Sequence, residues 1–97
     1  MNKVVINICY GGYGLSGEAQ TWLRERGRED LCDYDAPRHD PTLIECVETL
    51  GDRASGYCAD LAVVEIKGSR YRIEEYDGLE HVITPFDEVG WIDIEEK

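Results

Sequence analysis

The chain has 97 residues, the size of one domain, so we expect residues 1–97 to share a single core. Its 21 Asp and Glu residues outnumber its 10 Lys and Arg residues, which gives a formal net charge of −11. This balance argues against binding to nucleic acids or to anionic membranes, because both attract positively charged proteins. We find no apolar run as long as a membrane span and no signal peptide, and therefore expect a cytoplasmic protein.

The first part of the chain predicts a strand followed by a helix. Residues Val4–Tyr10 are mostly β-branched or apolar and carry no charge, as in a strand that is buried on at least one face. Ser16 is placed to cap a helix that runs to about Arg26, and Gly27 is placed to end it.

A second helix is predicted after a polar connection at residues 28–39. Asp40 is expected to cap it, Pro41 to occupy its first turn and Gly51 to end it. Its apolar face consists of Leu43, Ile44, Val47 and Leu50.

The remaining chain is dominated by predicted strands. The dipeptide Asp77-Gly78 predicts a tight hairpin turn. The predicted strands are Leu61–Ile66, Tyr71–Tyr76, Leu79–Thr84 and a short Trp91–Ile94. The element order β-α-α-β-β-β favours an α+β fold, with one antiparallel sheet of four to five strands and two helices on one face.

A glycine-rich turn joins the first strand to the first helix. Residues 12–17 (GYGLSG) match the G-x-G-x-x-G pattern, in which glycines admit a close phosphate and free helix N–H groups attract it. A dinucleotide fold would continue into a parallel strand, whereas here a second helix follows. We interpret the segment as a tight structural turn; the alternative is a phosphate-bearing ligand held by Gly12, Gly14 and Ser16.

Two side chains near this turn are candidates for ligand contacts. The ring of Tyr13, or that of Tyr10, would stack on a base, although a half-buried structural ring is the alternative. Arg38 would bind a phosphate through two hydrogen bonds, or would instead pair with Asp33 or Asp35 on the surface.

The sequence contains no recognisable catalytic constellation. His39 and His81 have no Ser or Cys nucleophile in a known motif. Glu74 and Glu75 are neighbours in a predicted strand, so they point to opposite faces and do not form a catalytic pair. We therefore expect no enzyme and no cofactor.

The cysteines indicate reduced thiols rather than a metal centre. The chain has four, and none forms a Cys-x-x-Cys pair. A zinc site built from Cys32, His39, Cys46 and Cys58 is the alternative. Cys9 lies in a predicted strand and Cys46 in a predicted helix, where free cysteines act as small apolar residues, so we expect no metal.

Four stretches together resemble a known family. In chain order they are KVVINICYGGYGLS, RHDPTLIECVETLG, ADLAVVEI and YRIEEYDGLE. They resemble the Thoeris anti-defence sponge proteins, which are small bacteriophage proteins. The resemblance implies a non-catalytic homo-oligomer in the cytoplasm of an infected bacterium. It would bind the cyclic ADP-ribose isomer released by a bacterial TIR-domain enzyme, in pockets between subunits.

The resemblance is incomplete after the last predicted hairpin. The family carries a basic element before an aromatic residue there, whereas residues 85–91 (PFDEVGW) contain no basic residue. The resemblance therefore transfers only Arg38 and the glycine turn as site residues.

With this resemblance, we expect a phage anti-defence protein that sequesters a nucleotide-derived immune signal without chemistry. The signal is a cyclic ADP-ribose isomer or a cyclic oligonucleotide. The predicted ligand-binding residues are Gly12, Tyr13, Gly14, Ser16 and Arg38. The alternative is an acidic phage protein that inhibits a host protein through its surface; the charge itself is also explained by solubility.

Overall fold

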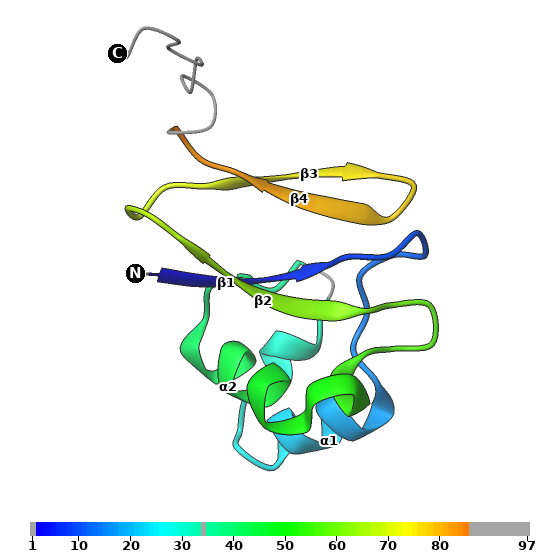
Figure 1. The fold of residues 1–97 in the computed structure, drawn as a ribbon. Coiled ribbons are helices and arrows are strands. Elements are labelled where there is room, and N and C mark those ends of the chain that lie inside the picture. Colours follow the sequence, from blue (N-terminus) through cyan, green and yellow to red (C-terminus); the bar gives the residue numbers. More distant parts are fainter. Residues whose placement is uncertain (1, 34, 86–97) are drawn as a thin grey trace, which may run out of the picture.

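The computed structural model describes residues 2–33 and 35–85 of the chain (Figure 1). In chain order its elements are β1 (Asn2–Asn7), α1 (Gly17–Arg24), the 3-10 helix η1 (Glu29–Cys32), α2 (Pro41–Leu50), the 3-10 helix η2 (Gly51–Ala54), β2 (Leu61–Ile66), β3 (Arg72–Tyr76) and β4 (Leu79–Ile83). The predicted α+β class is confirmed. The strand predicted at 91–94 lies outside the described residues.

The strands form two separate antiparallel pairs, β1 with β2 and β3 with β4. Figure 1 shows β1 and β2 between the helices on one side and the β3–β4 hairpin on the other. Side chains alternate accordingly: Val5 packs into the helical core, whereas Val4 and Ile6 pack into a second apolar cluster with Ile73 and Val82 of the hairpin.

The prediction of a single sheet is wrong, and the outer edge of β1 shows why. A joined sheet would need backbone bonds between β1 and β4. Instead, the N–H of Val5 donates to the carbonyl of Arg38 at 2.9 Å, and the N–H of Asn7 donates to the Glu80 carboxylate at 2.8 Å. A loop backbone and a side chain therefore take the positions at which a third strand would bind.

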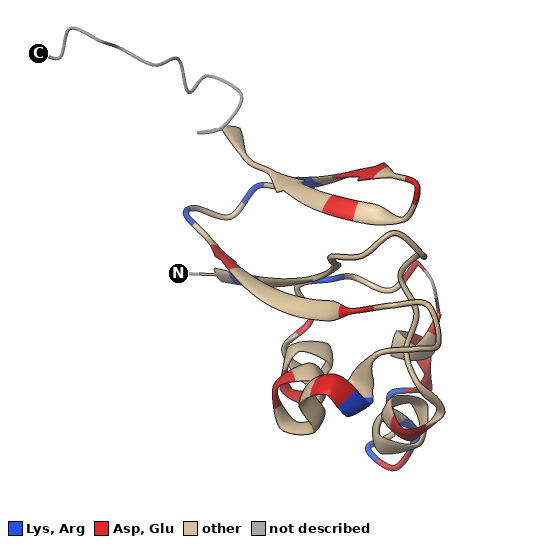
Figure 2. Cartoon of the chain, turned by 45° about the vertical axis from the view of Figure 1, so that its right-hand side comes forward, with Lys and Arg blue, Asp and Glu red and all other residues tan. Residues whose placement is uncertain are grey.

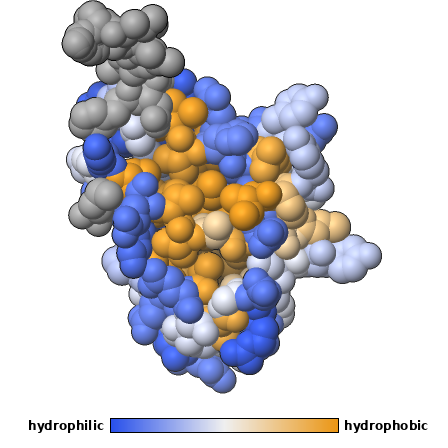
Figure 3. All heavy atoms as spheres, in the orientation of Figure 1, coloured by the Kyte–Doolittle hydropathy of each residue, from blue (hydrophilic) through white to orange (hydrophobic). Residues whose placement is uncertain are grey.

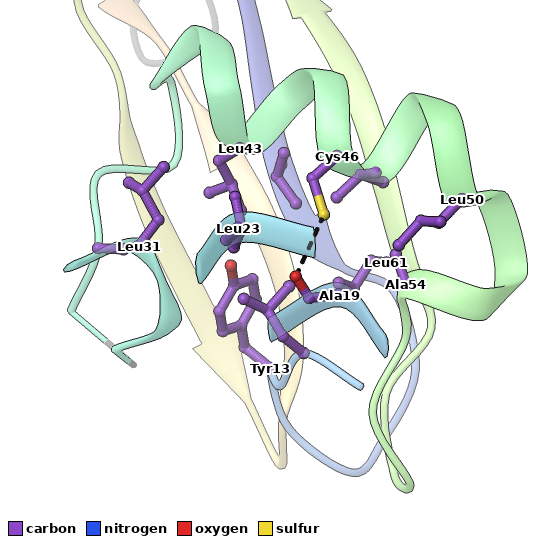
Figure 4. Close-up of a cluster of buried hydrophobic side chains, with 13 residues drawn as sticks. Tyr13, Ala19, Leu23, Leu31, Leu43, Cys46, Leu50, Ala54 and Leu61 are labelled. Atoms are coloured by element: carbon purple, nitrogen blue, oxygen red, sulfur yellow. Dashed lines mark hydrogen bonds between the residues drawn. The ribbon is translucent and has the colours of Figure 1, made fainter. Parts of the chain in front are cut away.

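The main core lies between the helices and one face of β1 and β2. Figure 4 shows Leu23 of α1, Leu43 and Cys46 of α2, and Leu61 of β2 converging with Tyr13. The Cys46 thiol donates to the carbonyl of Ala19 at 3.8 Å, and burial raises the pKa of Cys46 to about 11. This cysteine therefore remains a protonated part of the core.

The first helix ends as its sequence indicates, at Arg24 instead of about Arg26. Ser16 caps it by accepting the N–H of Ala19 at 3.0 Å. Gly27 has a φ of 72°, and the N–H groups of Gly27 and Arg28 bond back to the carbonyls of Arg24 and Leu23. This is a Schellman motif, in which a glycine with positive φ closes the helix.

The second helix begins at a charged cap. The Asp40 carboxylate accepts the N–H of Thr42 at 2.8 Å and a bond from Arg28 at 2.9 Å. Partial burial alone would raise the pKa of Asp40, but the bonds from Arg28 and from the Thr42 backbone outweigh burial and lower it. The ionised cap thus fixes the start of α2 and the connection before it.

Among the described residues, no helix has the length and apolar character that a membrane span requires.

We predict that Asp40→Asn preserves the cap but lowers the free energy of unfolding by about 1 kcal/mol. This loss applies above about pH 4, where the carboxyl group of the unfolded wild-type chain is ionised. Since the folded pKa is lowered, wild type loses this advantage as the pH falls through that pKa, and the two proteins converge. Urea denaturation across pH 2 to 7 measures the difference, with Asp52→Asn as the exposed control. A deficit that stays constant to the lowest pH contradicts the prediction.

Candidate functional site

The predicted glycine turn is a packing site for two other turns. A Cβ added to Gly11 would lie 1.9 Å from the backbone oxygen of Cys58, and one added to Gly78 would lie 2.5 Å from the nitrogen of Gly12. The predicted hairpin turn is confirmed, with φ values of 52° at Asp77 and 91° at Gly78. The close backbone approach that glycine permits therefore occurs within the chain itself.

Asn7, which no sequence motif marks as a site residue, joins these turns. Its side chain is fully buried and donates to the carbonyls of Gly78 at 2.7 Å and of Cys9 at 2.8 Å. Its amide oxygen accepts the N–H of Asp60 at 2.7 Å. A lone Asn among apolar strand residues is the only sequence signal of this role, because buried polar groups require partners.

The other glycine-turn candidates also have internal partners. The Ser16 hydroxyl donates to the carbonyl of Arg53 besides capping α1. The carbonyl of Gly14 accepts the N–H of Gly56 at 2.9 Å. Both groups thus hold the start of α1 against η2 and the connection that follows it.

Arg38 lies in a buried ion pair instead of on an open surface. Two of its nitrogens bind the two carboxylate oxygens of Glu80 at 2.7 and 2.9 Å, and the Arg38 side chain is 11% exposed. The predicted pairing with Asp33 or Asp35 is wrong. Bidentate geometry is the strongest form of an arginine–carboxylate contact, so Glu80 already occupies the guanidinium edge that would bind a phosphate.

Tyr13 lies beneath the same guanidinium. The Arg38 group is 3.5 Å from the centroid of the Tyr13 ring, and Tyr13 is 6% exposed. Burial raises the pKa of Tyr13 to about 12, so its hydroxyl stays protonated at neutral pH. The structure therefore brings Tyr13 and Arg38 together, but within the interior.

An open groove lies at the other end of the β1–β2 pair. It has a volume of about 470 Å³ and is bounded by the first residues of β1, by α2 and by the connection between β2 and β3. Its apolar lining is Val4, Pro41, Ile44 and Ile66. The volume falls within the range of small-molecule sites.

A histidine and a tyrosine form one wall of the groove. The Nδ1 of His39 is 2.7 Å from the hydroxyl of Tyr71, and their rings meet edge to face with centroids 5.7 Å apart. Partial burial raises the pKa of Tyr71, so its hydroxyl remains a hydrogen-bonding group at neutral pH. His39 was a weak candidate in the sequence because no motif surrounds it; its neighbour Tyr71 is 32 residues away.

Cations and carboxylates both border this groove, and two of the cations have no ion-pair partner among the described residues. Lys3 lines it and pairs with Glu48 at 2.7 Å, while Lys67 and Arg70 belong to the connection that forms its far side. Lys67 lines a second hollow of about 480 Å³, which shares Ile66 with the groove. Arg70 lines a third of about 190 Å³, which shares Tyr71 with it. Neither makes an ion pair with another residue of the described ranges, so both remain available to an anion.

The cysteines and histidines do not assemble into a metal site in the part of the chain that the structure describes. No three His, Cys, Asp or Glu side chains among these residues are grouped as metal ligands would be. The cysteines there are free thiols.

Comparisons of the chain with protein-family models, with curated proteins and with solved structures find no match. What the chain binds is therefore inferred from its own geometry, and the family resemblance stays a prediction.

We predict that Glu80→Gln destabilises the fold by about 3–5 kcal/mol, because the Arg38 charge is left buried without a counter-charge. Glu74→Gln is the matched control: it removes the exposed pair with Arg72, at 3.2 Å, and should change the free energy of unfolding by less than about 1 kcal/mol. Urea denaturation compares the two. Equal losses would show that the buried pair contributes no more than a surface pair.

We also predict that Gly11→Ala destabilises the fold by about 1–3 kcal/mol, since the added methyl group meets the Cys58 backbone. Gly14→Ala serves as control, because a Cβ there meets nothing within 4 Å. Thermal unfolding of both variants measures the effect. If Gly11→Ala is as stable as Gly14→Ala, the turns are not held in the close contact described.

Proposed function

We propose that the protein is a non-catalytic binding protein that sequesters a nucleotide-derived immune signal when a phage infects a bacterium. The signal belongs to the cyclic ADP-ribose isomers or the cyclic oligonucleotides. One observation carries the proposal: an open apolar groove with a His–Tyr wall lies beside cations that have no ion-pair partner among the described residues.

The groove combines the two features that a nucleotide requires. Ile44 and Ile66 offer an apolar floor, and the ring of Tyr71 lies beside it as a surface for a base. Lys67 and Arg70 lie at the outer side, where they would pair with phosphate oxygens. Glu45 and Glu48 line the opposite side, so phosphates would be directed toward the β2–β3 connection.

The distribution of basic residues also supports a ligand site at the groove end of the strands. Although the net charge is −11, Lys3, Lys67, Arg70 and Arg72 all lie at one end of the strands. Figure 2 shows blue segments around the connection between β2 and β3. Lys67 and Arg70 make no ion pair with the described residues, so this end offers two cations to an anionic ligand although the net charge is negative.

This site replaces the one predicted from sequence. Gly12, Gly14 and Ser16 hold other parts of the chain, and Tyr13 and Arg38 are buried, so the groove is the better candidate. Binding without chemistry fits an open groove in which His39 contacts a tyrosine instead of a nucleophile. We retain a homo-oligomer as part of the proposal, because it would deepen an open groove.

We predict that calorimetric titration detects one of these ligands with a Kd of about 10 μM or tighter, and that Lys67→Glu/Arg70→Glu weakens binding at least tenfold, about 1.4 kcal/mol. The matched control is Arg24→Glu/Arg53→Glu, which changes the net charge equally on the helical side. It should leave the affinity within about twofold.

Two outcomes would contradict the proposal. The absence of binding to every cyclic ADP-ribose isomer and cyclic oligonucleotide would reject the function. Equal weakening by the two double variants would reject the groove, because only overall charge would then matter. Amide shifts confined to residues 12–16 on ligand addition would place the ligand at the glycine turn instead.

A further inference from the structure

The end of the molecule opposite the groove is formed by three turns. β1 and β3 run toward it, and β2 and β4 start from it. The connections at residues 8–16, 55–60 and 77–78 therefore meet there, as Figure 1 shows. Their backbones touch, since Gly11 abuts Cys58 and Gly78 abuts Gly12.

These turns and the last residue of β3 expose large apolar side chains. Ile8 is 46% exposed, Tyr10 69%, Tyr57 103% and Tyr76 70%. No other large hydrophobic side chain in residues 2–33 and 35–85 is comparably exposed. We call Ile8, Tyr10, Tyr57 and Tyr76 the aromatic end. Exposed tyrosines on one surface are typical of protein-binding sites, because they offer contact area with few rotatable bonds.

The backbone beneath the aromatic end is held in place. The N–H of Ile8 donates to the carbonyl of Asp60 at 2.8 Å, and the Cys9 thiol donates to the carbonyl of Cys58 at 3.2 Å. The buried Asn7 side chain ties both to the hairpin turn. A surface that is already ordered loses little entropy on binding, which favours recognition of a partner.

The charges around the aromatic end have one sign. Segments 4–23, 54–66 and 73–85 contain no Lys or Arg. Asp60, Glu75 and Asp77 are exposed residues in or beside the three turns, and one carboxylate oxygen of Glu75 also accepts the N–H of Gly78. Figure 2 shows red segments at the hairpin tip. Figure 3 shows the apolar face of the strands, which extends toward this side of the molecule.

We propose that the aromatic end docks a partner protein that presents lysine and arginine side chains around an apolar surface. The tyrosines and Ile8 would contact the apolar part, and the three carboxylates would pair with the basic rim. A second copy of this chain fits poorly, because a twofold contact would oppose two acidic rims. This surface is separate from the groove and does not depend on the ligand.

Selection from a randomised peptide library displayed on yeast tests this inference. We expect wild-type protein to enrich peptides that combine Lys or Arg with apolar residues. The variant Tyr10→Ser/Tyr57→Ser/Tyr76→Ser should bind those peptides at least about tenfold more weakly. Because the three side chains are exposed, its thermal unfolding should match that of wild type.

Matched charge variants separate docking from general attraction. Asp60→Asn/Asp77→Asn removes two charges beside the aromatic end, and Glu25→Gln/Asp52→Asn removes two exposed charges on the helical side. The first should weaken the selected peptides several-fold and the second by less than about twofold.

Three outcomes would overturn the inference. One is enrichment of no peptide, or only of peptides that lack basic residues. A second is equal binding to wild type and the triple tyrosine variant, or equal sensitivity to the two charge variants. The third is self-association of the free protein in sedimentation that the tyrosine variant abolishes, which would make a second copy the occupant.

Discussion

The buried pair between Arg38 and Glu80 determines how the two halves of this molecule fit together. The carbonyl of Arg38 accepts the N–H of Val5, and a guanidinium nitrogen of Arg38 donates to the carbonyl of Val5. The Glu80 carboxylate accepts the N–H of Asn7. The outer edge of β1 is thus satisfied by one ion pair and one loop. Because burying these charges is tolerable only when all their bonds are made, the pair fixes the hairpin, the loop and the strand together.

This arrangement places two different surfaces at opposite ends of the strands. One end has cations and an apolar groove, and the other has tyrosines and carboxylates. Antiparallel pairing creates the separation, since each strand carries its connections to one end or the other. A net charge of −11 conceals this polarity, because composition alone averages over the whole surface.

Local features of the fold were predictable from sequence, and long-range ones were not. Helix caps and tight turns depend on neighbouring residues, so a local sequence pattern is sufficient to predict them. The examples are the caps Ser16 and Asp40, the Schellman Gly27 and the turn at Asp77. The partner of Arg38 is 42 positions away, and acidic residues much closer in sequence were plausible partners. The groove escaped prediction for the same reason, because its His–Tyr wall joins residues with no common motif.

The pairing of the first strand has a consequence for how the protein emerges during synthesis. β1 is made before the other elements of this fold, yet Asn2 pairs with Ile66 of β2 and the N–H of Asn7 bonds to Glu80 of β4. The helices have local caps and contacts and are able to form early, whereas β1 has no complete set of partners until β4 has been made. β1 therefore remains an apolar strand without its partners until β2 and β4 have been made.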